Sequence, residues 1–200
     1  MSETLNRLRR RPLFTPLWLP VFALLAAGAG IYWLGTWART TVVILVRHAE
    51  PAVADSGDPD LSAAGERRAA ALGEYLAAVL EGAKVDYLYA ADTRRAQQTA
   101  APVANQFGLP INLLASSDWE DLAGRIRREH RGETVVVVGY STTLPGVVTG
   151  LTGQTVRVND ADYGSIFVLF LPSPGDARVL RLHYDAAPST EPEQPPKKKS

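Results

Sequence analysis

Two patterns of apolar and polar positions alternate along most of the chain. The runs over residues 41–46 and 134–138 are short, continuous and rich in β-branched residues. Such runs are typical of strands that are buried on both faces of a parallel sheet. Elsewhere apolar residues recur every three or four positions, as at Leu72, Leu76 and Val79, which indicates a helix with one buried face.

These patterns predict strands that alternate with helices from residue 39 to residue 187. Strands are predicted over residues 41–46, 85–89, 111–114, 134–139, 165–171 and 178–184. Helices are predicted over residues 62–82, 96–107, 117–130 and 145–151. Ser62 is the expected N-cap of the first helix, and Ser117 with Glu120 has the spacing of a capping box at the third. This alternation predicts an α/β domain built as a three-layer sandwich, with helices on both faces of a mostly parallel sheet.

The N-terminal segment has a different pattern. Residues 1–12 are basic, and residues 13–38 contain no charged residue. A bilayer is crossed by about 20 apolar residues in a helix, so residues 13–38 are predicted to form one transmembrane helix, a signal anchor. The arginines precede this segment, and the positive-inside rule then puts the N-terminus in the cytoplasm. The domain is expected on the periplasmic, extracytoplasmic side of the inner membrane.

Two other interpretations of residues 13–38 stay open. A cleaved signal peptide could end near Ala27–Gly28–Ala29–Gly30, although the apolar run continues past these residues. A buried core helix is the soluble alternative, although its faces should differ in polarity. At the other end of the chain, residues 188–200 are rich in Pro, Glu and Lys and are predicted to form a disordered tail.

Composition narrows the classes of function. The chain has 21 Lys and Arg against 21 Asp and Glu, so no overall basic field argues for a nucleic-acid partner. It has no cysteine, which excludes disulfides and thiolate metal sites. The histidines His48, His130 and His183 lack the spacing of metal ligands. No metal and no cofactor is therefore expected.

Residues with possible catalytic or binding roles follow three of the predicted strands. Arg47 and His48 come directly after the first strand, Arg95 comes shortly after residues 85–89, and Tyr140 and Ser141 come after residues 134–139. Because parallel strands place their carboxyl ends at one edge of a sheet, these side chains are expected to gather there. Arginine forks match phosphate geometry, and a neutral histidine nitrogen is a nucleophile.

Four short motifs give these residues a family context. They are Arg47–His48–Ala49–Glu50, Leu61–Ser62–Ala63–Ala64–Gly65, Arg95–Ala96–Gln97–Gln98–Thr99–Ala100 and Gly139–Tyr140–Ser141–Thr142–Thr143–Leu144–Pro145. In this order they resemble the motifs of the histidine phosphatase superfamily, also called phosphoglycerate mutase-like. The resemblance implies that His48 attacks phosphorus and becomes a phosphohistidine. It also implies that Arg47 and Arg95 surround the phosphoryl group.

The chain departs from the family pattern at Tyr140, where the family has its second histidine. A histidine there could carry a positive charge, whereas a tyrosine hydroxyl is a neutral donor. The usual Ser-Pro before the second arginine is also replaced, in Ala91–Asp92–Thr93. Turnover is therefore expected to be weakened or abolished, with anion binding retained.

The predicted site has a catalytic set of His48, Arg47, Arg95 and Tyr140, and the substrate is expected to contact Arg47, Arg95, Tyr140, Ser141 and Glu50. The general acid is left unassigned. Asp118, Glu120 and Asp121 lie in the region where several family members carry it, but carboxylates also suit the first turn of a helix. Glu50 is either at the rim of the pocket or a loop carboxylate.

Two functions of different class follow from this site. The first is a membrane-anchored histidine phosphatase that hydrolyses a phosphomonoester, on a phosphorylated small molecule or a phosphoprotein. The alternative is a catalytically inactive pseudophosphatase that binds phosphate or a protein partner.

Overall fold

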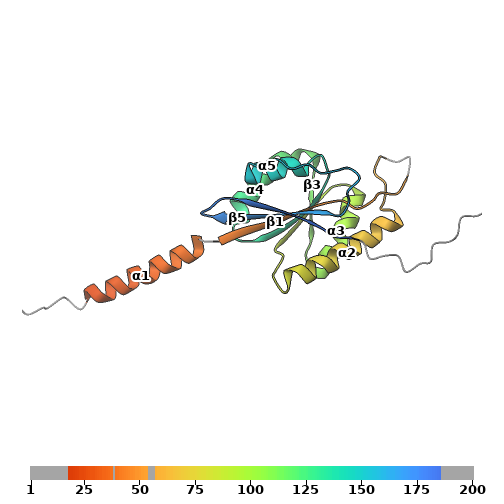
Figure 1. Ribbon diagram of the computed structural model, residues 1–200. Helices are drawn as coiled ribbons and strands as arrows, with labels where there is room; N and C mark the ends of the chain where they lie inside the picture. Colours follow the sequence, from red (N-terminus) through yellow and green to blue (C-terminus); the bar gives the residue numbers. More distant parts are fainter. Residues whose placement is uncertain (1–17, 38, 54–56, 186–200) are drawn as a thin grey trace, which may run out of the picture. The chain divides into compact units, whose positions relative to one another are not determined.

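A six-stranded sheet with the strand order β3-β2-β4-β1-β5-β6 forms the centre of the domain (Figure 1). The computed structural model describes residues 18–37, 39–53 and 57–185. It divides at residue 38 into two units, of which the first contains helix α1 and the second contains the sheet. The predicted basic segment 1–12 and the predicted tail 188–200 lie outside the described residues.

The two strands in the middle of the sheet are the two continuous apolar runs. β1 (Arg39–Arg47) pairs in parallel with β4 (Thr134–Gly139), in a register that ends with Arg47 opposite Gly139. Residues 43–46 and 135–138 are at most 2% exposed. Burial on both faces explains why these segments contain no polar side chain.

The sheet is mixed but mostly parallel, as predicted, because only β5 runs against the other five strands. β2 (Tyr87–Ala91) and β3 (Ile111–Leu114) run parallel to β1 and β4. β5 (Ser165–Ser173) pairs antiparallel with β1, and β6 (Arg178–His183) pairs antiparallel with β5. The connection between β5 and β6 is too short for the crossover that a parallel pair requires.

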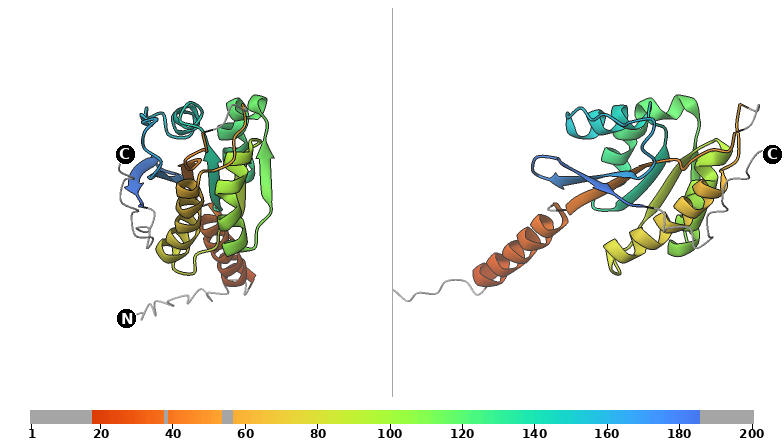
Figure 2. Two further views of the ribbon diagram at one scale, coloured as in Figure 1. Left: turned by 90° about the vertical axis from the view of Figure 1, so that its right-hand side faces the viewer. Right: turned by 45° about the vertical axis from the view of Figure 1, so that its right-hand side comes forward.

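Helices cover both faces of the sheet, as the α/β prediction requires. α2 (Ala63–Leu80) packs against α3 (Arg94–Phe107) on one face, and α4 (Trp119–Glu129) packs against α5 (Leu144–Thr152) on the other (Figures 1 and 2). α3 begins two residues before its predicted start, and β2 begins two residues after its predicted start. Every other predicted element of the domain is present, with small shifts at its ends.

The predicted transmembrane signal anchor over residues 13–38 is not confirmed. α1 (Trp18–Trp37) is a 20-residue helix within this segment, and residues 13–17 and 38 lie outside the described residues. Pro20 and three glycines interrupt its apolar residues. Among the residues that the structure describes, no helix has both the length and the hydropathy needed to cross a membrane.

The predicted capping box at Ser117 is wrong. A 3-10 turn, η1 (Ser116–Asp118), precedes α4, and Asp118 at its third position takes the role that the prediction gave to Glu120. The Asp118 carboxylate accepts from the backbone nitrogen of Ala115 at 3.2 Å. The Ser117 hydroxyl instead donates to the same carboxylate at 3.2 Å.

The start of α2 lies directly against the segment that follows β1. Ser62 is the N-cap of α2 and accepts from the backbone nitrogen of Gly65 at 3.1 Å, as predicted. The carbonyl oxygen of Glu50 accepts from the backbone nitrogen of Ser62 at 2.9 Å. Gly65 has no room for a side chain, because a Cβ atom there would overlap the Glu50 carbonyl.

We therefore expect Gly65→Ala to destabilise the domain by about 2 kcal/mol or more, because either α2 or the Glu50 segment must move. The matched control is Gly146→Ala in α5, where a Cβ atom meets nothing within 4 Å. There the higher helix propensity of alanine should stabilise the fold by about 0.5–1 kcal/mol. Urea unfolding of the two variants measures both effects, and equal stabilities would contradict the close approach at Gly65.

Candidate active site

The carboxyl ends of β1 and β4 and the first turn of α3 bring four predicted residues together. Arg47 and His48 follow β1, Tyr140 follows β4, and Arg95 lies in the first turn of α3. The ring centroids of His48 and Tyr140 are 5.7 Å apart, and the Arg95 guanidinium carbon lies 5.3 Å from the Tyr140 centroid. The tertiary structure thus places two arginines and a tyrosine around one histidine.

His48 is held in a single tautomer by the backbone. Its ring nitrogen Nδ1 lies 2.8 Å from the carbonyl oxygen of Ala49. A carbonyl oxygen only accepts hydrogen bonds, so Nδ1 carries the proton and Nε2 carries the lone pair. Among the described residues no group hydrogen-bonds to Nε2. This is the arrangement that a nucleophilic imidazole requires.

The electrostatic surroundings keep His48 neutral. The side chain is 5% exposed. Burial is the largest of the influences that lower the pKa of His48 from its ordinary 6.5 to about 4, and the charges of Arg47 and Arg95 lower it further. The hydrogen bond to Ala49 and the charge of Glu50 act in the opposite direction. Near pH 7 the lone pair on Nε2 is therefore available.

Arg47 is buried, at 8% exposure, and forms no ion pair with an acid in the part of the chain that the structure describes. Its Nη1 atom donates to the backbone carbonyls of Asn159, at 3.4 Å, and Asp160. The Tyr163 ring covers the guanidinium with its centroid 4.1 Å away. Nε of Arg47 is buried without a hydrogen-bond partner among the described residues. A buried, unpaired donor on a cation is suited to an anion.

Arg95 differs from Arg47 because an acid lies beside it. Its Nη1 atom is 3.6 Å from a carboxylate oxygen of Asp58, and its side chain is 19% exposed. The same carboxylate accepts from the backbone nitrogen of Arg94 through both oxygens, at 3.1 Å each. Asp58 was not predicted, since nothing in the polar loop over residues 51–60 distinguishes it from the other acids there.

Tyr140 points its hydroxyl at a residue that the sequence analysis did not assign. The hydroxyl donates to Oγ1 of Thr93 at 2.8 Å. Thr93 is the N-cap of α3, and its side chain makes no capping hydrogen bond. The substituted lead-in to the second arginine and the substituted second histidine are thus in direct contact. This pairing was visible in the sequence only as two departures from the family pattern.

Thr99, also missed, connects the two motifs that carry His48 and Arg95. Its buried hydroxyl accepts from the backbone nitrogen of Ala49 at 2.9 Å and donates to the carbonyl oxygen of Arg95 at 2.7 Å. One side chain therefore fixes the end of β1 against the first turns of α3. The threonine of the third motif is explained by this contact.

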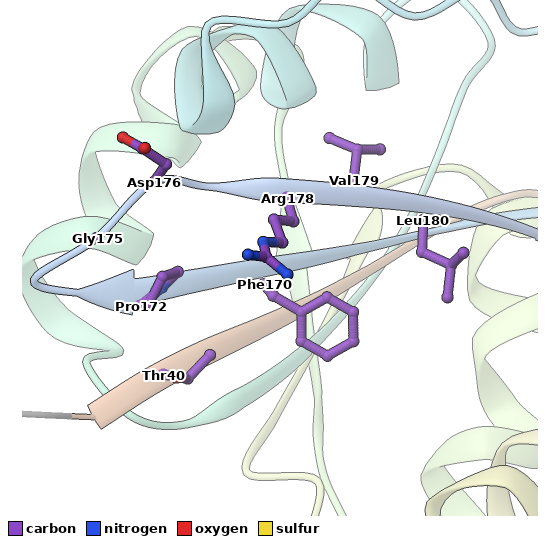
Figure 3. A pocket seen from close by; sticks show the side chains of 8 residues that line it. All are labelled: Thr40, Phe170, Pro172, Gly175, Asp176, Arg178, Val179 and Leu180. Atoms are coloured by element: carbon purple, nitrogen blue, oxygen red, sulfur yellow. The ribbon is translucent and has the colours of Figure 1, made fainter.

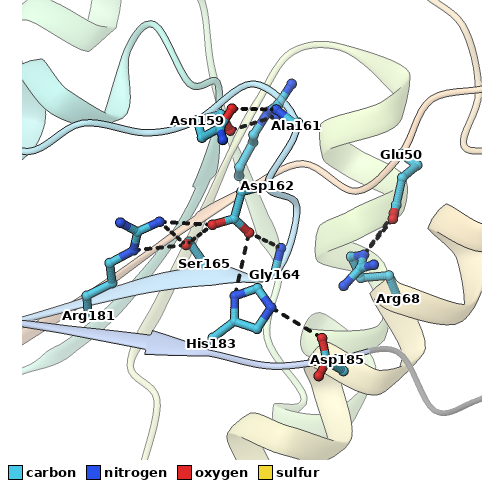
Figure 4. A network of polar contacts seen from close by, with 11 residues as sticks. Glu50, Arg68, Asn159, Ala161, Asp162, Gly164, Ser165, Arg181, His183 and Asp185 are labelled. Atoms are coloured by element: carbon cyan, nitrogen blue, oxygen red, sulfur yellow. Dashed lines mark hydrogen bonds and ion pairs between the residues drawn. The ribbon is translucent and has the colours of Figure 1, made fainter.

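Glu50 and Ser141, which were also predicted for the site, do not join the group around His48. The carboxylate of Glu50 forms a two-pronged ion pair with Nε of Arg68, at 2.8 and 2.9 Å (Figure 4). Ser141 lies half-buried in the turn after β4, and its side chain makes no hydrogen bond within the described residues. Neither residue contacts His48 through an ion pair, a hydrogen bond or a ring contact.

The acids considered for proton transfer have structural roles in α4. Glu120 and Asp121 lie in its first turn, where carboxylates interact favourably with the helix dipole. Asp121 also pairs with Arg128 at 3.0 Å. No group of three or more metal-ligating side chains occurs within the described residues.

A cavity of about 730 Å³ lies at the opposite end of β1 and has no part in this site. Its lining comes from Thr40, the β5–β6 hairpin and the turn between those strands (Figure 3). Thr40 is near the start of β1, whereas His48 follows its end. The cavity is therefore separate from the site around His48.

The fold and the site define an α/β protein with a buried histidine and two arginines at the carboxyl edge of its sheet. Residues 43–118 match the family model of the histidine phosphatase superfamily, branch 1. The match covers the first three of the four motifs and supports the resemblance that they indicated. No curated protein sequence matches the chain.

Solved structures share this fold. A protein histidine phosphatase SixA complexed with tungstate is 18% identical with a TM-score of 0.56, over 71% of this chain and 96% of that one. A mycobacterial hydrolase is 18% identical with a TM-score of 0.57, over 76% of this chain and 94% of that one. A phosphoglycerate mutase from Plasmodium falciparum is 19% identical with a TM-score of 0.50, over 76% of this chain and 96% of that one.

Proposed function

We propose that this protein is a phosphatase in which Nε2 of His48 takes the phosphoryl group from a phosphorylated substrate. The observation that carries the proposal is the state of His48, which is neutral, fixed in the tautomer with a free Nε2, and flanked by Arg47 and Arg95. A histidine with a purely structural role has no need of this combination.

The proposed reaction has two displacements at phosphorus. In the first, the Nε2 lone pair forms a bond to phosphorus, the bond from phosphorus to the leaving oxygen breaks, and that oxygen takes a proton from water or from a group on the substrate. In the second, water attacks phosphorus, the N–P bond breaks, and phosphate leaves. Negative charge on the equatorial oxygens is stabilised by Arg47 and Arg95 in both steps.

The substrate is proposed to be a phosphorylated small molecule or a phosphoprotein. The described SixA relative is a protein histidine phosphatase, which supports including a phosphohistidine substrate in the first assays. Glu50, which was predicted to contact substrate, is engaged with Arg68 and is therefore proposed to shape the pocket rim. The predicted position of the domain outside the cytoplasm stays a prediction from the sequence.

The alternative is a pseudophosphatase that binds phosphate without turnover. The observation that favours it is the hydrogen bond from the Tyr140 hydroxyl to Thr93, because this uses the one proton that Tyr140 could donate to a phosphate oxygen. Anion binding would then depend on the two arginines alone.

Turnover and binding, measured on the same purified full-length protein, separate the two functions. Turnover is measured with p-nitrophenyl phosphate and with a phosphohistidine peptide, and binding of inorganic phosphate by calorimetry. Turnover of either substrate, with an acid-labile phosphoryl adduct trapped on the protein, is expected for the phosphatase. Saturable phosphate binding without turnover would establish the alternative.

The pH dependence follows from the lowered pKa of His48. Only the neutral imidazole attacks, so kcat/KM should not be limited by His48 above about pH 5 and should fall about tenfold per pH unit below about pH 4. The measurement is kcat/KM from pH 3.5 to 7.5, divided by the fraction of substrate in its reactive ionic form. An acid limb centred near 6.5 would contradict a buried, neutral His48.

A further inference from the structure

Arg47 is held by a loop that is far from it in the sequence. The loop over residues 153–164 joins α5 to β5 and returns to the carboxyl end of β1. It supplies the carbonyls of Asn159 and Asp160, which accept from Nη1 of Arg47 across more than 100 residues of chain. It also supplies Tyr163, whose ring lies over the guanidinium at 4.1 Å.

The loop is itself fixed next to Tyr163. The Asp162 carboxylate accepts from the backbone nitrogen of Gly164 at 3.0 Å and from the Ser165 hydroxyl at 2.5 Å (Figure 4). Arg181 of β6 donates to it at 2.9 Å, and Nδ1 of His183 lies 3.5 Å away. Burial acts to raise the pKa of Asp162, but these hydrogen bonds outweigh it and lower the pKa overall. The carboxylate therefore stays ionised and anchors the loop to the sheet.

The partners of Arg47 orient its guanidinium without cancelling its charge. Two carbonyls and an aromatic ring are neutral, and no carboxylate among the described residues pairs with Arg47. Nη1 is occupied and one ring covers a face of the plane, which leaves the donors on Nε and Nη2 for another ligand. Arg95 lacks this arrangement, since Asp58 already lies beside it.

We propose that Tyr163 is a positioning residue for substrate, which acts by holding the Arg47 guanidinium in the orientation that presents Nε to the phosphoryl oxygens. The role in turnover rests on the proposed function, whereas the role in anion binding does not. Tyr163 is also 6.1 Å from His48 between ring centroids, so the guanidinium is fixed beside the attacking imidazole. The contact uses the ring and not the hydroxyl, so phenylalanine should replace tyrosine.

The test compares Tyr163→Leu, Tyr163→Phe, Arg47→Ala and the double variant Arg47→Ala/Tyr163→Leu in the full-length protein. The readout is the affinity for inorganic phosphate by calorimetry, with thermal unfolding as the check on folding. Tyr163→Leu should weaken phosphate binding about three- to tenfold, the size expected from loss of a partly desolvated cation–π contact. Tyr163→Phe should bind within about twofold of the unchanged protein, because it keeps the ring.

The double variant and a matched control decide whether Tyr163 acts through Arg47. In the Arg47→Ala background, Tyr163→Leu should have no further effect on phosphate affinity. Tyr87→Leu is the control, since Tyr87 lies at the opposite end of the strands, and it should leave the affinity unchanged. Equal losses from Tyr163→Leu with and without Arg47, an equal loss in Tyr163→Phe, or no phosphate binding by the unchanged protein would overturn the inference. Absence of turnover with the expected binding pattern would instead overturn only the proposed function.

Discussion

His48→Ala should abolish turnover, with a fall in kcat/KM on the order of 10⁴-fold, because no other group in the site can form the covalent intermediate. Phosphate affinity should change little, since Arg47 and Arg95 stay in place. The acid-labile phosphoryl adduct should disappear from the protein. Steady-state kinetics, calorimetry and mass spectrometry of acid-quenched protein measure these three results.

The matched control for this variant is His183→Ala. His183 is 55% exposed on β6 and makes the longest of the contacts to Asp162, at 3.5 Å. Its loss should therefore leave turnover within a few-fold of the unchanged protein. Turnover or an adduct that persists in His48→Ala would reject His48 as the nucleophile. A large loss of phosphate binding in His48→Ala would instead indicate that the histidine mainly supports the structure of the site.

Tyr140→His should raise the turnover rate by about 100-fold, the low end of the usual contribution of one positioned acid or base in a transition state. The physical reason is charge. Tyr140 lies beside His48 and Arg95 but supplies no cation, and its hydroxyl proton is directed to Thr93. An imidazolium at the same position would stabilise the charge that spreads over the phosphoryl oxygens.

Tyr140→Phe separates the ring of this residue from its hydroxyl. It keeps the aromatic contact with Arg95 and removes only the hydrogen bond to Thr93, so its turnover should match that of the unchanged protein if the hydroxyl is not used. Comparison of kcat for the three forms, at matched thermal stability, gives the answer. Lower turnover in both Tyr140→His and Tyr140→Phe would show that the tyrosine hydroxyl has a positive role in a modified mechanism.

The two arginines of the site are expected to contribute unequally to binding. Arg47 is buried among neutral partners, so an anion that reaches it gains a full, poorly solvated charge interaction. Arg95 is partly balanced by Asp58 at 3.6 Å, so the same anion must compete with a carboxylate that is already present. Anion binding should therefore depend more on the orientation of Arg47 than on that of Arg95. For this reason the contact between Arg47 and Tyr163 is expected to affect function.

Most of the fold could be predicted because it depends on local pattern. The segments 111–114 and 134–139 form strands with the predicted ends. For 134–139 the reason is burial, since a continuous apolar run suits a central strand that is covered on both faces. Ser62 caps α2 as predicted, because the capping interaction spans only three residues. The sequence did not indicate that β5 is the reversed strand, since strand direction depends on how the connections cross the domain and not on the residues within the strand.

The sequence alone determined which side chains meet at the carboxyl edge of the sheet: Arg47, His48, Arg95 and Tyr140 each follow a strand or begin a helix that a local pattern locates. Only the tertiary structure decided their state. The carbonyl of Ala49 and the burial of the ring make His48 a neutral nucleophile, and Arg68 engages Glu50. The loop that carries Tyr163 orients Arg47. The protonation state and tautomer of His48 and the orientation of Arg47 depend on desolvation and on contacts between distant segments. These properties cannot be predicted from the pattern of apolar and polar residues.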